Sequence, residues 1–527
     1  MQKIIASCLI LICLLFWACN EGSPKAKALD FLKVAQMSSH QKFKILLEEG
    51  HPDLPLTKEE RDQLNSFYKA KGYQRIFTDD TTYTQAGKAW NATLQKHEYF
   101  GLPQNRFASS KNSNLLIQEL LLHFNLGVAL HDLDSGYIDF KKAHYKERIW
   151  SFIPKNWLTT PTATDSILLS RGPADTNYRF FAQHLYHFRD TAHIDTTSFE
   201  LVTEKENKKL AWEKLKFALL TKGLITENSD SLSIRKVVRS YQKSHGLIAD
   251  GLIGQATVIS YKESGQDRFA RAMIALDRLR QEKTKPKSFI GINIPSFALI
   301  FVADDTLRAQ HKIIVGKIEH PTPTLESRIS RMISLPYWKV PSSIARKEVL
   351  PALKRNPAYL NKEHMRIYKA EQMEVNPAAV NWKKVKDNTF PYQIIQDPGP
   401  WNSLGLIKFE FANNFSVYVH DTPSRYLFAQ NYRSFSHGCM RCDQPIELGK
   451  KILNFDKTVT KTNPVSPDSL QSLIDQQIHQ SIPLLKSLPI FVSYTSVTAD
   501  QKGLYFHLDL YQKEQKLIAL LRTKNNG

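Results

Sequence analysis

The sequence predicts an α+β protein in which helical domains precede a mostly β domain. Up to residue 282 apolar residues recur three and four positions apart, as on one face of a helix. From Ser288 onward they alternate or form short runs, as in strands. The length of 527 residues suits two to four domains. With 42% hydrophobic and 23% charged residues, the composition excludes a wholly disordered, collagen-like or coiled-coil chain.

The N-terminus has the features of an export signal. Lys3 precedes an apolar run over 4–18, which is shorter than the roughly 20 residues that a membrane-spanning helix needs. The pair Ala18-Cys19, followed by polar residues, resembles a bacterial lipoprotein box. We therefore expect a signal peptide over 1–18, lipidation of Cys19, a lipidated linker over 19–27, and an exported, membrane-anchored lipoprotein facing the periplasm. Plain secretion and an uncleaved anchor are the alternatives.

Residues 28–210 are predicted to form a helical scaffold domain. Helical spacing is clearest over 60–73 and 114–133, and no chemical motif occurs in this region. A further amphipathic pattern starts at 267, and it is followed by a polar stretch up to Lys287. We expect residues 263–287 to be a scaffold helix and linker.

Residues 211–262 are predicted to form a small three-helix domain. The string RSYQKSHGLIADGLIGQAT contains the pairs Tyr241-Gln242 and Asp250-Gly251, and then Gly254 to Thr257. This pattern resembles the repeat of the three-helix peptidoglycan-binding domain. The resemblance implies that Tyr241, Gln242, Asp250 and Gly251 belong to a peptidoglycan-binding domain. The alternative is a generic bundle whose Asp-Gly pair is only a turn.

The β half is predicted over 288–515, with 516–527 as a tail. Runs at 289–294 and 298–302 predict one hairpin, and runs at 406–411 and 415–420 predict another around Ala412-Asn413-Asn414. A strand at 312–315 and two near the C-terminus complete the pattern. A helix over 445–454 is expected, with Asp443 as its N-cap.

The strongest chemical signal is the string Ser436-His437-Gly438-Cys439-Met440-Arg441-Cys442, which follows a strand-end His420. A cysteine nucleophile needs a base because an ordinary thiol is mostly protonated at neutral pH. Gly438 permits a sharp turn whose N–H groups could stabilise an oxyanion. A helix starting near Asp443 would favour the thiolate. Arg441 could hold a carboxylate or orient the loop.

A strand-end histidine, followed nineteen positions later by the cysteine of S-H-G-C-x-R, resembles the L,D-transpeptidase (YkuD-type) catalytic domain. The flanking segments 336–360, 398–411 and 417–428 are similar to those of the large periplasmic enzymes of this family. The resemblance implies that Cys439 is the nucleophile and His420 the base. It also implies that His437 and Gly438 shape the oxyanion site and that Ser436 holds the loop. Arg441 stands where the family has Arg or Asn, and Tyr418 lines the pocket. A helical lid is inserted at about 320–395.

By the same resemblance, the enzyme would cross-link peptidoglycan stem peptides (3→3) through a Cys439 thioester. Water as the acceptor would make it an L,D-carboxypeptidase, and a protein amine would give protein attachment. The expected partners are stem peptides, glycan, the membrane through the lipid, and carbapenem-type inhibitors, with no cofactor, metal or nucleic acid. The net charge of +20 suits an anionic partner such as the cell wall. A non-catalytic peptidoglycan-binding lipoprotein is the rival interpretation.

Cys442 departs from the family pattern, which usually has an aliphatic residue there. A C-x-x-C pair is also found in redox and zinc sites. We favour the simplest interpretation, that Cys442 fills an apolar slot. A reversible Cys439–Cys442 disulfide that switches the enzyme off is the remaining hypothesis.

Overall fold

The structure, a computed structural model, describes residues 37–162, 164–194, 197–245, 247–282, 285–369, 373–460 and 465–522. The expected signal peptide, Cys19 and the linker 19–27 lie outside these residues. Within them no helix is both long and apolar enough to cross a membrane. The chain divides into two compact units: the first contains Met1–Asp139 and Tyr145–Gly172, and the second contains Phe140–His144 and Pro173–Thr523.

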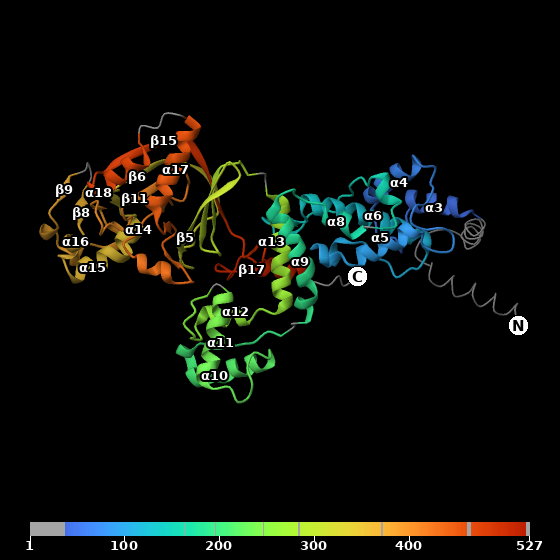
Figure 1. The fold of residues 1–527 in the computed structure, drawn as a ribbon, viewed down its shortest axis with the longest axis horizontal. Coiled ribbons are helices and arrows are strands. Elements are labelled where there is room, and N and C mark those ends of the chain that lie inside the picture. Colours follow the sequence, from blue (N-terminus) through green and yellow to red (C-terminus); the bar gives the residue numbers. More distant parts are fainter. Residues whose placement is uncertain are drawn as a thin grey trace. The chain divides into compact units, whose positions relative to one another are not determined.

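The first unit is helical, as the sequence predicts. A buried helix, α6, is surrounded by shorter ones (Figure 1, blue to cyan). The α-helices are α3 (Ser39–Glu48), α4 (Lys58–Lys69), α5 (Gln85–Gln95), α6 (Leu115–Ser135), α7 (Lys155–Leu158) and α8 (Thr164–Leu169), and the short strand β1 (Ile138–Asp139) follows α6. Capping boxes at Ser38 and Thr57 set the starts of α3 and α4. The core contains Phe43, Leu64, Tyr68 and Leu120.

The second unit begins with helices. Figure 1 shows α9 (Thr176–Ile194) and α13 (Gly265–Gln281) side by side. Between them in sequence lie α10 (Glu204–Thr221), α11 (Ser231–Ser244) and α12 (Gln255–Tyr261), which share one core. That core starts at Phe199, so the three-helix cluster extends further toward the N-terminus than the expected 211–262.

The rest of the second unit is organised around one large sheet. Its order is β13-β5-β14-β12-β11-β6-β15-β3-β4, and β4 also pairs with β5, so eight strands close into a ring. The strands are β3 (Phe289–Asn293), β4 (Ala298–Ala303), β5 (Thr306–Gly316), β6 (Leu325–Ser334), β11 (Ile407–Phe411), β12 (Val419–His420), β13 (Ser434–Ser436), β14 (Met440–Cys442) and β15 (Gln480–Ser493). Alternate side chains fill the core together with α17 (Pro445–Thr460) and α18 (Pro467–Asp475). A hairpin of β16 (Val497–Asp500) and β17 (Gly503–Phe506) and the helix α19 (Gln515–Arg522) follow.

The predicted hairpin 289–302 is confirmed as β3–β4. The second hairpin is confirmed in pairing but not in length, because β12 contains only Val419 and His420. The expected N-cap at Asp443 is wrong. Helix α17 begins at Pro445, and the Asp443 N–H instead donates to the Lys312 carbonyl oxygen at 2.9 Å, which continues the strand pairing.

The lid forms a small layer of its own. It begins after Ser334, later than the expected residue 320, because Leu325–Ser334 belong to β6. Besides helices it contains a sheet in the order β7-β10-β8-β9. Its elements are β7 (Trp338–Lys339), α14 (Ser342–Ile344), a π-helical turn (Ala345–Val349), α15 (Leu350–Arg355), α16 (Tyr359–Lys362), β8 (Met365–Tyr368), β9 (Glu374–Val375) and β10 (Gln393–Gln396).

Candidate active site

The structure brings the predicted cysteine and histidine onto one face of the large sheet. Strands β12 and β14 pair in parallel, with His420 opposite Arg441. Because side chains alternate along a strand, Tyr418 and His420 point to the same side as Cys439 and Arg441. The residues between them are buried in the core. Cys439 is therefore a diagonal neighbour of His420 across two adjacent strands, with Tyr418 packed edge-on to His420 at 5.5 Å between ring centroids.

The turn before Cys439 is held by hydroxyl groups. Gly438 has φ +110°, a conformation that side chains rarely adopt. The Ser436 hydroxyl donates to the Cys439 carbonyl oxygen at 2.6 Å and accepts the Gly438 N–H at 3.2 Å. The Thr322 hydroxyl donates to the Gly438 carbonyl oxygen at 2.8 Å. The Ser436 hydroxyl therefore bridges the two ends of this turn, and an oxyanion could take the Gly438 N–H only by displacing this serine.

His420 is placed to act as a neutral base. It is 4% exposed, and its Nδ1 lies 2.5 Å from the Asp421 carbonyl oxygen. A carbonyl oxygen only accepts, so Nδ1 carries the proton and Nε2 keeps its lone pair. Burial, with the charge of Arg441 adding to it, lowers the pKa of His420 to about 3, although main-chain carbonyls of Asp421 and Leu404 oppose this. The imidazole is therefore uncharged at neutral pH.

Cys439 is a thiol rather than a preformed thiolate. Burial is the largest influence and raises its pKa, while hydrogen bonds from Tyr418 and the charges of Lys408 and Arg441 lower it less. The thiolate expected from a nearby helix start is not supported. A neutral thiol beside a neutral imidazole can still react, because the proton can move to the histidine during attack.

The pH dependence of Cys439 alkylation tests this state. Since only the thiolate reacts and its pKa is raised above the ordinary 9.0, we expect the iodoacetamide rate to rise about tenfold per pH unit from pH 6 to 8.5 without levelling off. Peptide mapping by mass spectrometry separates Cys439 from Cys442. A plateau near pH 7 would indicate a thiolate–imidazolium pair instead.

Arg441 carries an unsatisfied donor. Its Nε is buried and has no hydrogen-bond partner among the described residues, although it lies opposite His420 in the sheet. A buried donor without a partner is costly unless a ligand completes it. The site could therefore accept an anionic group beside the histidine.

The lid reaches this site at two points. His437 Nε2 lies 2.7 Å from Glu348 Oε1, which is on the π-helical turn of the lid. The His437 ring also stacks on His320, with centroids 5.2 Å apart. The Trp338 side chain of β7 lies beside the Tyr418 hydroxyl. The lid therefore touches residues on both sides of Cys439, and π-turns of this kind often occur at functional sites.

Sequence reasoning missed Lys408. Its Nζ lies 2.6 Å from Glu410 Oε1 and 4.1 Å from the centre of the Tyr418 ring, and the residue pairs with His420 across β11 and β12. Alternation in the run 406–411 already places Lys408 and Glu410 on the polar face. Only the register between strands shows that this face leads to the cysteine.

Cys442 lies on the opposite face from Cys439, fully buried in the core, and both cysteines are free. Residues three apart along a strand are separated by about 10 Å between Cα atoms, whereas a disulfide needs less than about 7 Å. A Cys439–Cys442 bridge would require β14 to come apart. In the described part of the chain, no three His, Cys, Asp or Glu side chains are placed to hold a metal ion.

We expect Cys442→Val to leave acyl transfer within about twofold of the unchanged protein and to change the free energy of unfolding by under about 1.5 kcal/mol, because the side chain only fills core space. Activity is measured with and without reductant. Protection from oxidative inactivation in the variant would instead support the disulfide hypothesis.

The residues predicted for the peptidoglycan-binding domain come together around the Asp-Gly turn, where Gln242 and Gly251 are buried, Tyr241 is half-buried and Asp250 is exposed. The Gln242 amide, 1% exposed, donates to Asp250 Oδ1 and the Thr257 hydroxyl at 3.0 and 3.1 Å and accepts the Gly251 N–H at 2.8 Å. Tyr241 stacks on Tyr261 with centroids 4.2 Å apart. These side chains fix the Asp-Gly turn.

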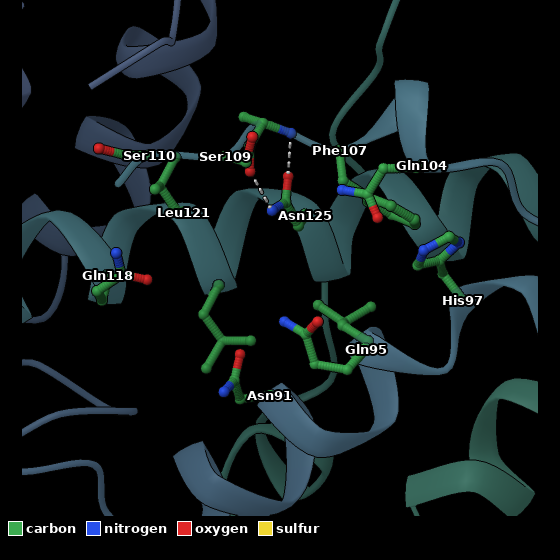
Figure 2. A pocket seen from close by; sticks show the side chains of 13 residues that line it. Asn91, Gln95, His97, Gln104, Phe107, Ser109, Ser110, Gln118, Leu121 and Asn125 are labelled. Atoms are coloured by element: carbon green, nitrogen blue, oxygen red, sulfur yellow. Dashed lines mark hydrogen bonds between the residues drawn. The ribbon is translucent and has the colours of Figure 1, made fainter. Parts of the chain in front are cut away.

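A separate cavity lies in the first unit between α5 and α6. It has a volume of about 150 Å³, and amide side chains such as Asn91 and Gln95 point toward it (Figure 2). The Asn125 amide is bonded at both ends to the Ala108 backbone, at 2.9 and 2.8 Å. None of the residues predicted to carry chemistry lines this cavity.

Comparisons with known proteins agree with the resemblance. Residues 287–465 match the YkuD family model, the L,D-transpeptidase catalytic domain. A Haemophilus influenzae protein, named provisionally as an L,D-transpeptidase, is 28% identical over 229 residues, which cover 43% of this chain and 45% of that protein. The chain thus spans less than half the length of this relative.

Two solved structures show slight similarity. An L,D-transpeptidase from Mycobacterium smegmatis is 13% identical with a TM-score of 0.18, over 39% of this chain and 58% of that one. One from Stackebrandtia nassauensis is 12% identical with a TM-score of 0.19, over 53% and 88%. Similarity this slight supports neither a fold nor a function.

Proposed function

We propose that this chain, whose residues 287–465 match the L,D-transpeptidase catalytic domain, cross-links peptidoglycan stem peptides (3→3) through a thioester on Cys439. One observation carries the proposal. The cysteine and the neutral histidine lie on the same face of adjacent parallel strands, inside the matched domain. The Nε of Arg441 beside them is buried and has no hydrogen-bond partner within the described part of the chain, which supports an anionic substrate.

The residues supply a complete proton cycle. His420 Nε2 takes the thiol proton as the Cys439 sulfur attacks the carbonyl carbon of the third stem residue. The amide bond to the terminal D-Ala breaks, and His420 returns the proton to the leaving amine. The side-chain amine of a second stem then attacks the thioester and loses its proton to His420, and the thiol is restored when that proton returns to sulfur.

The remaining parts of the proposal concern location and binding. An exported lipoprotein, lipidated at Cys19, would hold the enzyme at the membrane on the periplasmic side. The three-helix domain would bind glycan. The net charge of +20 suits an anionic cell wall. Carbapenem-type inhibitors would acylate Cys439, as the family resemblance implies.

The test is incubation of the purified protein, without its signal, with a disaccharide-tetrapeptide, followed by mass analysis of the products. We expect a dimer that lacks one alanine, absent with Cys439→Ala. A tripeptide monomer alone would identify an L,D-carboxypeptidase. No Cys439-dependent product, with reductant present, would overturn the catalytic proposal and leave the peptidoglycan-binding lipoprotein. Transfer only when a protein amine is supplied would identify protein attachment.

A further inference from the structure

An open groove lies on the sheet next to the candidate nucleophile, and Tyr418, which lies beside Cys439, is one of its lining residues. It has a volume of about 410 Å³, and Tyr418, Glu410 and Arg331 are among the residues that line it. This volume is in the range of small-molecule and peptide sites. The proposed acyl-transfer steps assign no part of either substrate to this groove.

Strand register connects the groove, through Tyr418, to Cys439. Arg331 of β6 pairs with Glu410 of β11. In the neighbouring row Lys408 pairs with His420, and His420 pairs with Arg441. The next row on this face lies two residues back along β12 and β14 and two residues forward along the antiparallel β11. It puts Tyr418 beside Glu410 and Cys439 beside Tyr418. The four side chains Arg331, Glu410, Tyr418 and Cys439 therefore form one row on one face of the sheet.

The row is long compared with the terminal residue that leaves the acyl carbon when Cys439 is acylated. Neighbouring strands are about 4.8 Å apart, so three steps place Arg331 roughly 14 Å from Cys439. A single leaving residue spans only about 3.5 Å, and it reaches no further than Tyr418. The remaining groove can hold the side chain and backbone of a longer peptide.

The position of the base decides which substrate uses this side. His420 is on β12, the strand between the cysteine and the groove. An amine that transfers its proton to His420 must approach from over β12. The other neighbour of β14 in the sheet is β5, which also pairs with β13. The turn Ser436–Gly438 starts in β13 and therefore lies on the β5 side of the cysteine. The Glu348–His437 contact of the lid is on this side too. The acyl group is therefore expected on that other side.

Charges in the groove suit a carboxylate at its far end. Arg331 is half-exposed and lies 3.6 Å from Glu410 Oε2, and Lys408 bonds the other oxygen of the same carboxylate at 2.6 Å. Two cations around one carboxylate leave one positive charge in excess. Glu410 fixes the direction of the guanidinium, whose remaining N–H groups can form a charge-assisted pair with a carboxylate.

We infer that this groove binds the acyl acceptor, an amine-bearing peptide whose amine lies over Tyr418 beside Cys439 and whose carboxylate binds Arg331. The inference rests on the proposed acyl-transfer function. Arg331 is then a specificity-determining residue for the acceptor, and Glu410 is a positioning residue that acts through it.

The experiment separates the two substrates. A donor tetrapeptide with its amine acetylated can only acylate Cys439, and a second peptide with a free amine and a free carboxylate serves as acceptor. We expect Arg331→Gln to raise the acceptor KM about tenfold or more, as the loss of one hydrogen bond between charged groups predicts. Amidating the acceptor carboxylate should raise the KM of the unchanged protein and remove most of the effect of the variant.

Arg328→Gln is the matched control. Arg328 is on the same strand, and its replacement removes the same charge. Its guanidinium donates to the Ser487 hydroxyl, and Arg328 does not line the groove. We expect its acceptor KM to stay within twofold. The assignment is overturned if Arg331→Gln behaves like Arg328→Gln, if the amidated acceptor is equally sensitive, or if acyl-enzyme formation falls as much as acceptor use.

A binding measurement keeps the two proposals distinguishable. Calorimetry on the Cys439→Ala protein detects acceptor binding without chemistry, and Arg331→Gln should weaken that binding about tenfold. If the unchanged protein forms no acyl-enzyme but binds the peptide through Arg331, the transfer function fails and the groove stands as a peptide-carboxylate site. If acyl transfer occurs and Arg331→Gln changes neither binding nor KM, the groove assignment alone fails.

Discussion

Replacing His420 with glutamine lowers the rate of acyl-enzyme formation about 10²- to 10⁴-fold, the range that general acid–base groups contribute. Glutamine can still donate to the Asp421 carbonyl oxygen, which His420 Nδ1 meets at 2.5 Å, but it has no basic nitrogen to take the thiol proton. The measurement is the mass-detected rate of donor attachment to Cys439 over a range of pH. Because a pKa of about 3 leaves His420 neutral across the whole range, the unchanged protein should lose no activity from protonation of this residue between pH 5 and 8.

His311→Gln is the control for this variant. His311 is also buried, at 8% exposed, and its Nδ1 also meets a main-chain carbonyl, that of Asp443, at 2.9 Å. We expect its rate to stay within about threefold and both variants to unfold at similar temperatures. A His420→Gln protein that keeps more than a tenth of its rate would show that another group, such as His437, removes the proton.

Replacing Arg106 with methionine destabilises the first unit by about 3–5 kcal/mol, the cost of leaving one partner of a buried ion pair alone. Arg106 Nε meets Asp132 Oδ2 at 2.6 Å and its Nη2 meets Oδ1 at 2.9 Å, with both side chains at most 2% exposed. The guanidinium also donates to the carbonyl oxygens of Lys146 and Glu147. The free energy of unfolding, measured in urea by a probe in this unit, gives the effect.

Two comparisons sharpen this result. Lys58→Met breaks the pair with Asp62, whose side chains are 72% and 52% exposed, and should cost no more than about 0.5 kcal/mol. Adding Asp132→Leu to Arg106→Met should recover most of the lost stability, because no buried charge then remains. If Arg106→Met lowered the free energy of unfolding by less than about 1 kcal/mol, Asp132 would not remain as an unpaired buried charge in the variant.

Local patterns in the sequence predict the elements well, whereas contacts between distant segments stay hidden. The alternation over 289–302 predicts β3 and β4, and the spacing over 114–133 predicts α6. Glu348 lies almost ninety positions before His437, and nothing near either residue indicates that they meet at 2.7 Å. Arg331 and Glu410 likewise become neighbours only through β6–β11 pairing.

At the candidate site itself, the sequence predicts which residues matter but not their state. The motif around Cys439 and the strand-end His420 are visible in the sequence, and the structure places them on one face. Their charge depends on burial, which raises the cysteine pKa and lowers that of the histidine. In the three-helix domain the sequence predicts the motif but not its packing. The Gln242 amide is 1% exposed, donates to Asp250 Oδ1 and accepts the Gly251 N–H, so it holds the Asp-Gly turn.

The ring of strands also dictates the order in which the site can form during synthesis. Ile290 of β3 pairs with Ile490 of β15, so the sheet closes only through segments about two hundred residues apart. Pairings this distant in sequence form slowly. A growing chain completes Cys439 some fifty residues before β15 ends at Ser493. Until β15 is made and pairs with β6, the strand that carries Arg331 has an unpaired edge. The row from Cys439 to Arg331 is therefore incomplete in the nascent protein.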